Sequence, residues 1–205
     1  LLTLGARLVD GDAVVAWEDG LQQSTLAPQA ADDALTSFLG RRVRLARASD
    51  IDGGAIERTD PDSDELLRDR RLVLSEVTTG QLGSMSAPGT LFDFASLHVL
   101  STPTLAELER LGGDSSGDCR RFRPNLVLDI DGPPFQENAW PGKQLKFASG
   151  VVLDVAIQTP RCVVPSLPQR GLPRRVETIR AVAATNRIEI EGYGVYSCVG
   201  AYASV

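Results

Sequence analysis

The stretch LHVLSTPTLAELERLGG, residues 97–113, joins an apolar strand to an amphipathic helix. Its apolar run at residues 97–100 is typical of a buried strand. Residues 101–103, Ser-Thr-Pro, supply a hydroxyl cap and a proline in the first turn, and so predict the start of a helix. Gly112 and Gly113 predict its end. The apolar face of this predicted helix carries Leu105, Leu108 and Leu111.

After this unit the sequence is dominated by short strands. Strands are predicted at residues 126–130 and 151–157, and apolar residues at helical spacing predict a helix around residues 176–183. The tail, residues 187–205, is strand-like. Its bends or bulges are expected at Gly192, Gly194 and Gly200.

Before this unit the sequence predicts a hairpin. Its strands are expected at residues 1–9 and 13–17, with Gly11-Asp12 as the turn. Strands and helices do not alternate along the chain as they do in a doubly wound parallel sheet. The predicted fold class is therefore mainly β with a few helices (α+β), as a barrel or a mixed sheet.

A helix and a further strand are predicted after the hairpin. The helix is expected at residues 31–39, with Asp32 and Asp33 in its first turn and Gly40 just past its end. The strand is expected at residues 43–46. From residue 49 to about residue 89 the sequence is polar and without clear periodicity, which indicates a boundary segment.

The composition excludes several classes of function. The chain has 205 residues, of which 42% are hydrophobic, so it is large enough for a real core. Its net charge of −6 argues against a nucleic-acid groove or a polybasic membrane surface. No apolar run is long enough for a membrane span. The three cysteines, an odd number without paired spacing, fit a reducing, cytoplasmic location better than a disulfide framework.

One motif match is rejected on its context. Residues 113–117, GDSSG, satisfy the G-x-S-x-G pattern of a hydrolase nucleophile elbow, which needs a strand before it and a helix after it. Here a helix is predicted before it and a strand after it. The only histidine, His98, also precedes the serine, whereas in that fold it follows. We interpret the match as a loop, and His98 as a packed, hydrogen-bonded strand residue.

The segment RRFRPN, residues 120–125, is a candidate ligand site directly before the predicted strand at 126–130. Three arginines around a phenylalanine fit a solvated edge. Arg123 and Asn125 at a strand entrance also fit a binding site, because a guanidinium fork and an amide suit phosphate or ring-amide groups. The residues alone leave both interpretations open.

The segment TPRCV, residues 159–163, is the second candidate and follows the predicted strand at 151–157. Its Cys162 comes directly after an arginine in a proline-framed turn, which fits a reactive thiolate that binds a soft metal or carries sulfur. Free cysteines are also commonly inert core residues. Both roles stay open at this point.

Together and in this order, the two segments resemble the MOSC domain. This is the C-terminal domain of molybdenum cofactor sulfurases and the core of the mitochondrial amidoxime reducing component and its bacterial relatives. The landmarks are residues 97–108, 121–127, 135–140, 161–162 and 193–196. Residues 1–46 likewise resemble the end of the β-rich module that precedes this domain in the reductase branch.

The resemblance implies a β-barrel core and a division of the chain into three parts. Residues 1–48 would be the C-terminal part of the N-terminal β-rich module, truncated because the chain starts inside a predicted strand. Residues 49–89 would be a polar connecting segment. Residues 90–205 would form the MOSC domain itself.

The resemblance also implies a cofactor, a molybdenum atom held by the dithiolene of molybdopterin and by one protein thiolate. Cys162 matches that metal ligand and is the expected catalytic residue. Arg123 and Asn125 match cofactor-contacting positions, and Tyr196 matches a further cofactor neighbour. Asp93 is another candidate for cofactor binding, although it equally fits the cap of a turn.

The chain departs from the family in two places. It has no Val-Lys-Ser type segment near its beginning, where the reductase branch contacts the cofactor phosphate, and Pro160 stands where the animal reductases have serine. Pyridoxal phosphate is not expected, because it belongs to the desulfurase domain that is fused to MOSC domains in the sulfurases. The only lysines here, Lys143 and Lys146, match no site for it.

The function implied is a molybdenum-dependent oxidoreductase that reduces N-hydroxylated or N-oxide-type small molecules with electrons from a donor protein. Two alternatives stay open. One is a sulfur carrier or cofactor-handling protein that uses a persulfide on Cys162. The other is a non-catalytic β-rich binding module with an ordinary buried cysteine.

Overall fold

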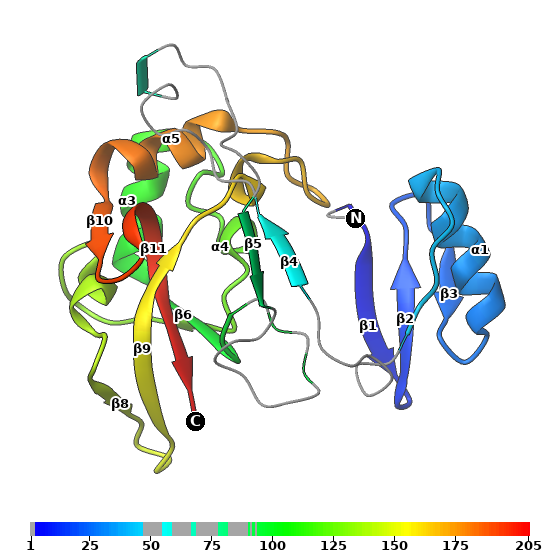
Figure 1. The fold of residues 1–205 in the computed structure, drawn as a ribbon, viewed down its shortest axis with the longest axis horizontal. Helices are drawn as coiled ribbons and strands as arrows, with labels where there is room; N and C mark the ends of the chain where they lie inside the picture. Colours follow the sequence, from blue (N-terminus) through cyan, green and yellow to red (C-terminus); the bar gives the residue numbers. More distant parts are fainter. Residues whose placement is uncertain are drawn as a thin grey trace. The chain divides into compact units, whose positions relative to one another are not determined.

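The computed structural model describes residues 3–46, 55–58, 67–68, 78–81, 90, 92 and 94–205 (Figure 1). The fold is α+β, in agreement with the coarse class that the sequence predicts. The chain divides into two compact units, Leu1–Asp52 with Pro168–Arg174, and Gly53–Leu167 with Arg175–Val205. The predicted three-part division of the chain stays a prediction.

The first unit contains a three-stranded antiparallel sheet in the order β1-β2-β3. Its strands are β1 (Gly5–Val9), β2 (Asp12–Ala16) and β3 (Gln22–Ser24). The predicted turn at Gly11-Asp12 is wrong by one residue, because Asp12 pairs with Val9 and the turn consists of Asp10 and Gly11. Both turn residues have positive φ, 52° and 82°, a backbone that Asp-Gly accommodates well in a two-residue hairpin turn.

Helix α1 (Pro28–Leu39) packs against β3 and buries Ala31 and Leu35. It begins earlier than predicted, because Pro28 suits the first helical position, so the expectation of acidic residues in its first turn is wrong. Gly40 ends it as predicted, in the left-handed conformation at φ 64°.

The strand predicted at residues 43–46 is wrong, because this extended segment pairs with helix side chains rather than with another strand. The Val43 amide donates to the Thr36 hydroxyl at 3.1 Å, and that hydroxyl donates to the Val43 carbonyl at 3.2 Å. The Leu45 amide donates to the Asp32 carboxylate at 2.6 Å. Side chains of α1 therefore satisfy backbone groups that a sheet would otherwise pair.

The second unit is built on a curled, half-barrel sheet with the strand order β7-β6-β11-β9-β8, and β10 pairs with β11 (Figure 1). Strands β6 and β7 run parallel, and the other pairs of this sheet are antiparallel. Its strands are β6 (Leu97–Ser101), β7 (Leu126–Leu128), β8 (Gln144–Lys146), β9 (Val152–Pro160), β10 (Arg187–Ile190) and β11 (Gly194–Ser204). A separate antiparallel pair joins β4 (Ala55–Arg58) to β5 (Thr78–Gln81). All of the predicted strands after residue 96 are present, whereas β8 was not predicted.

The helices that pack near this sheet include both α-helices and short 3₁₀ helices. Among them are α3 (Thr102–Gly112), α4 (Cys119–Phe122), α5 (Val176–Thr185), η2 (Gln136–Ala139) and η3 (Val164–Ser166). Helix α5 packs against α3 and β11. In the part of the chain that the structure describes, no helix is long and apolar enough to cross a membrane.

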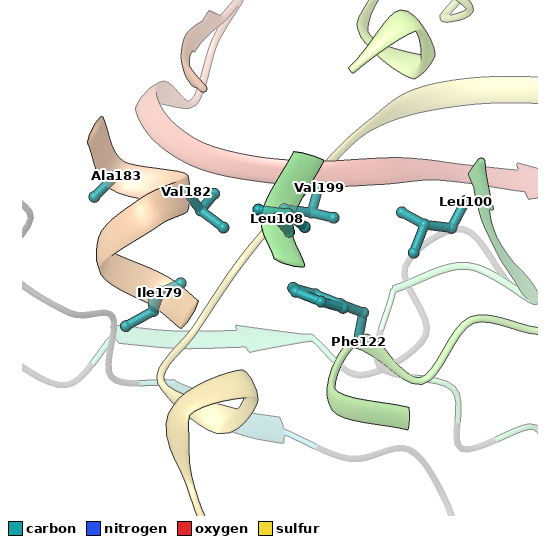
Figure 2. Close-up of a cluster of buried hydrophobic side chains, with 7 residues drawn as sticks. All are labelled: Leu100, Leu108, Phe122, Ile179, Val182, Ala183 and Val199. Atoms are coloured by element: carbon teal, nitrogen blue, oxygen red, sulfur yellow. The ribbon is translucent and has the colours of Figure 1, made fainter. Parts of the chain in front are cut away.

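Two apolar clusters form the core of the second unit. Figure 2 shows the cluster between the helices and the sheet, which consists of Leu100, Leu108, Phe122, Ile179, Val182, Ala183 and Val199. The other cluster consists of Val99, Leu153, Val155, Ala201 and Ala203. Val99 and Leu100, which are neighbours on β6, thus belong to different clusters, because successive side chains of a strand point to opposite faces of the sheet. The predicted face of α5 is confirmed, whereas Leu111 of α3 is exposed.

The start of α3 is stabilised by a carboxylate rather than by its N-cap hydroxyl. Glu137 is fully buried and accepts a hydrogen bond from the Ser101 amide at 2.7 Å and from the Thr104 hydroxyl at 2.8 Å. The hydroxyl cap that the sequence predicts at the start of this helix is not made. Glu137 lies in one of the landmarks of the MOSC resemblance, and in this structure it serves the fold.

Candidate functional site

Cys162 lies between the end of β9 and η3, in the segment at residues 161–165, which includes the first two residues of η3 and which we call the cysteine loop. Its thiol is free and the residue is half-buried. The preceding Arg161 extends the pairing of β9 with β11, because its amide donates to the Ser197 carbonyl at 2.8 Å. Tyr196, which is half-buried, is the neighbour of Ser197 on β11 and pairs with Ile188 of β10.

Arg123 and Asn125 lie in the turn at residues 122–125, which we call the arginine turn and which connects α4 to β7. Arg123 is exposed and adopts the left-handed conformation, with φ 55° and ψ 48°. Its amide donates to the Cys119 carbonyl at 3.0 Å and closes the end of α4. A non-glycine residue in this conformation is uncommon and requires support from its surroundings.

His98 fixes the far end of the arginine turn. The Asn125 amide donates to the His98 carbonyl at 2.9 Å, and the His98 amide donates to the side-chain oxygen of Asn125 at 2.8 Å. The side-chain oxygen of Asn125 is therefore engaged in the fold. Its amide group, on an exposed residue, is the part that suits a ligand acceptor.

The structure brings the two candidate segments together through two hydrogen bonds that run in opposite directions. Arg161 of the cysteine loop donates through Nη2 to the Phe122 carbonyl at 3.1 Å, and its guanidinium lies 5.6 Å from the centroid of the Phe122 ring. Arg121 of α4 donates through Nη1 to the Pro165 carbonyl at 3.2 Å. Cys162 lies between these two attachment points.

The ring of His98 is buried and hydrogen-bonds through Nε2 to the Val199 carbonyl at 3.1 Å. Burial and the nearby positive charge of Arg161 lower the pKa of His98 to about 3, against the opposing effect of hydrogen bonds to backbone groups. The imidazole is therefore neutral near pH 7. This environment confirms the interpretation of His98 as a packed, hydrogen-bonded residue.

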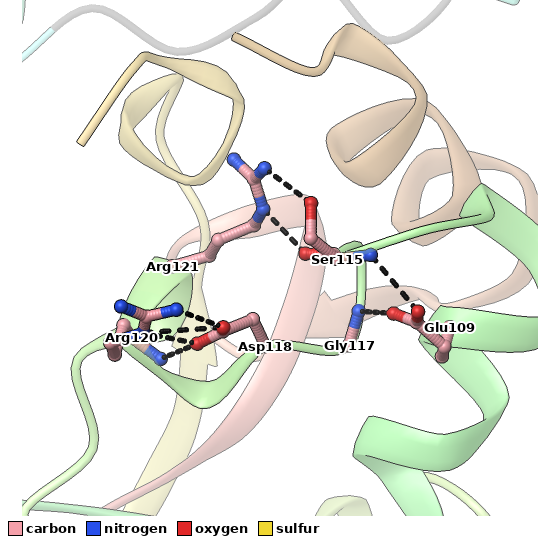
Figure 3. A network of polar contacts seen from close by, with 6 residues as sticks. All are labelled: Glu109, Ser115, Gly117, Asp118, Arg120 and Arg121. Atoms are coloured by element: carbon pink, nitrogen blue, oxygen red, sulfur yellow. Dashed lines mark hydrogen bonds and ion pairs between the residues drawn. The ribbon is translucent and has the colours of Figure 1, made fainter. Parts of the chain in front are cut away.

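The loop at residues 113–117 has the wrong context for a nucleophile elbow. It lies between α3 and α4, not between a strand and a helix. Figure 3 shows that the buried Arg121 binds both oxygens of Ser115, the carbonyl through Nε at 2.6 Å and the hydroxyl through Nη2 at 2.9 Å. The Glu109 carboxylate accepts the Ser115 and Gly117 amides at 2.9 and 2.7 Å. We conclude that Ser115 and its loop serve the fold.

The structure also shows roles that the sequence did not indicate. The sequence identified Arg161 only as the neighbour of Cys162, and the structure shows that its guanidinium binds a carbonyl and a ring of α4. Arg121 was one of three undifferentiated arginines, yet it alone of the three is fully buried. Asp93 lies outside the described residues.

The side chains of the cysteine loop and the arginine turn do not by themselves form a complete metal site. Among the described residues there is no group of three or more His, Cys, Asp or Glu side chains that would hold a metal ion. Cys162 offers a single soft ligand, Arg123 a cation and Asn125 an amide donor. Such a set suits a bound group that carries an anion and brings further metal ligands of its own.

No protein-family model matches the chain, and no curated protein matches it.

Proposed function

We propose that Cys162 and the arginine turn bind a molybdenum–molybdopterin cofactor, and that the chain contains a MOSC-type oxidoreductase domain. The proposal rests on one observation, the two opposed hydrogen bonds that hold the cysteine loop against the end of α4. Segments that lie 39 residues apart in the sequence, and that the resemblance assigns to one cofactor, are thereby neighbours. The curled sheet is compatible with the barrel core that the resemblance implies.

Each residue has a distinct part in this proposal. Cys162 would supply the thiolate ligand of the metal, beside the sulfur ligands that the cofactor itself brings. Arg123 would bind the cofactor phosphate or pterin as an exposed cation, and the Asn125 amide would donate to a ring acceptor. Tyr196 would lie beside the cofactor. When bound, the cofactor would supply oxygen-atom transfer and a two-electron change at the metal.

The substrate class and partner belong to the same proposal. The substrates would be N-hydroxylated or N-oxide-type small molecules, and a separate electron-donor protein would supply the electrons. The neutral His98 is bound to the Val199 carbonyl, so we assign it no proton transfer near pH 7.

The half-buried free thiol also favours a second function, the sulfur carrier. In that case the Cys162 thiolate would attack the outer sulfur of a desulfurase persulfide, break its S–S bond, release the desulfurase thiolate and hold the transferred sulfur as a persulfide. No permanent metal would then be required, and Asn125 would contribute little.

The test is the molybdenum and pterin content of the chain, produced in cells that make the cofactor. Cys162→Ser is compared with Cys119→Ser, a matched control because Cys119 is also a half-buried free thiol. We expect close to one molybdenum per chain in the wild type and in Cys119→Ser, and a loss in Cys162→Ser. Arg123→Ala and Asn125→Ala should each weaken pterin retention.

The absence of both molybdenum and pterin from the wild-type chain would overturn the proposal. A persulfide found on Cys162 after incubation with a desulfurase, and lost in Cys162→Ser, would then establish the sulfur carrier.

A further inference from the structure

We propose that Arg161 is a positioning residue, which fastens the cysteine loop to the arginine turn and so sets where Cys162 lies relative to Arg123. The geometric part of this proposal stands on the structure of the chain alone. Its consequence for a cofactor rests on the proposed function.

Arg161 connects three separate elements. Its backbone follows β9 and donates to Ser197 of β11 at 2.8 Å. Its side chain donates to the Phe122 carbonyl at the end of α4 at 3.1 Å and stacks over the Phe122 ring at 5.6 Å. The carbonyl and the ring face compensate part of the cost of partly burying a guanidinium. One residue thus fixes the start of the cysteine loop against two neighbours.

Arg121 fastens the other end of the cysteine loop. It is fully buried and donates to the Pro165 carbonyl at 3.2 Å, while its remaining nitrogens bind Ser115. Because Arg121 also organises the loop before α4, its removal would disturb much more than the position of Cys162. Arg161 is therefore the residue whose substitution isolates the attachment of the loop.

The arginine turn is held at both ends by hydrogen bonds. Arg161 holds it at Phe122, and His98 holds it at Asn125 through two hydrogen bonds. Arg123 lies between these points in the left-handed conformation, directly before a proline, a sequence context in which helical backbone is disfavoured. We infer that loss of the Arg161 contact lets the backbone of Arg123 relax. The Arg123 guanidinium and the Cys162 thiol then no longer keep one fixed arrangement.

Three variants separate positioning from general stability. Arg161→Met keeps much of the side-chain volume and removes the donors, and Arg161→Lys keeps a cation and a donor without the planar fork. Arg110→Met is the control, because Arg110 is exposed and pairs with Glu107 of the same helix. The alkylation rate of Cys162 by iodoacetamide is measured at increasing pH, and the variants are compared where the rate no longer rises with pH.

We expect Arg161→Met to raise the alkylation rate of Cys162 about tenfold, the factor that corresponds to the loss of one hydrogen bond from a charged donor. Arg161→Lys should restore part of the protection, and Arg110→Met should leave the rate unchanged. Cys198 is fully buried and serves as an internal reporter of general unfolding. Mass spectrometry distinguishes the two sites, and we expect Cys198 to stay protected.

Two outcomes would overturn the positioning role. One is that Cys162 in Arg161→Met is alkylated at the same rate as in the wild type. If Arg161→Met does not fold, the same comparison is made with Arg161→Lys. The other is a parallel rise at Cys198, which would show a purely structural role. Molybdenum content, measured on the same samples, should fall in Arg161→Met. If the wild type holds no molybdenum, the proposed function fails, while the alkylation rates still decide the role of Arg161.

Discussion

A single buried histidine should make the stability of this protein depend on pH in the range where few other groups titrate. The chain has one histidine, His98, and its pKa falls from 6.5 to about 3 on folding. Burial is the main cause, and the charge of Arg161 adds to it. Between these two pKa values the unfolded chain binds a proton that the folded chain does not, so the free energy of unfolding rises with pH.

The magnitude follows from the two pKa values. Lowering the pH from about 7.5 to about 5 should reduce the free energy of unfolding by about 2 kcal/mol, and the loss continues until the pH approaches 3. The folded-state pKa values of Asp12, Glu107 and Asp118 are lowered by hydrogen bonds, so these carboxyl groups titrate mainly below this window. The histidine therefore dominates between about pH 5 and pH 7.

Urea unfolding at the two pH values measures this effect directly. We expect the wild type to lose about 2 kcal/mol, and His98→Gln, although less stable at both values, to lose less than about 0.5 kcal/mol. If the variant lost as much stability on acidification as the wild type, another group would be responsible and the reasoning about His98 would be refuted. An unchanged wild type would show that the ring is protonated as easily in the folded state as in the unfolded chain.

Three further substitutions test other parts of the structure by the same urea measurement. Glu137→Ala should cost about 3 kcal/mol, because it leaves two buried donors at the start of α3 unpaired, and a loss below about 1 kcal/mol would contradict this role. Gly200→Ala should lower the free energy of unfolding by about 2–4 kcal/mol, because Gly200 has a φ of 80° and a Cβ there would meet the His98 ring and the Val99 carbonyl. Gly142→Ala, also at positive φ but in open space, should lower it by only about 1 kcal/mol. Arg123→Gly should be more stable than Arg123→Ala by about 0.5–1 kcal/mol, since glycine tolerates the left-handed backbone, and equal stabilities would argue against this conformation.

The local features of the fold could be predicted from the sequence where the signal is itself local. The strand-to-helix stretch at residues 97–113 is present, and Gly40 and Gly113 end α1 and α3 as their positions indicate. The errors arose where a more distant partner intervened. Side chains of α1 bind the segment at residues 43–46, and the carboxylate of Glu137 replaces the expected hydroxyl cap of α3.

Sequence reasoning named candidate residues for the site but could not predict their arrangement. Arg123, Asn125 and Cys162 could be singled out by residue type, proline context and family resemblance. Their roles in the resemblance remain predictions. That Arg161 acts on α4, and that Arg121 is buried, could not be predicted, because arginine at a surface loop and arginine inside a core look alike in the sequence.

Sequence patterns were sufficient to predict β6, α3, β7, β9, α5 and β11 of the second unit, because periodicity, proline and glycine act on backbone conformation within a few residues. Which segments meet at Cys162 depends instead on contacts between residues that are far apart in the chain. The contacts that join them span 27, 39 and 44 residues. Their partners include the backbone carbonyls of Phe122 and Pro165. Since every residue carries such a carbonyl, no pattern of residue types reveals which one a distant arginine will bind.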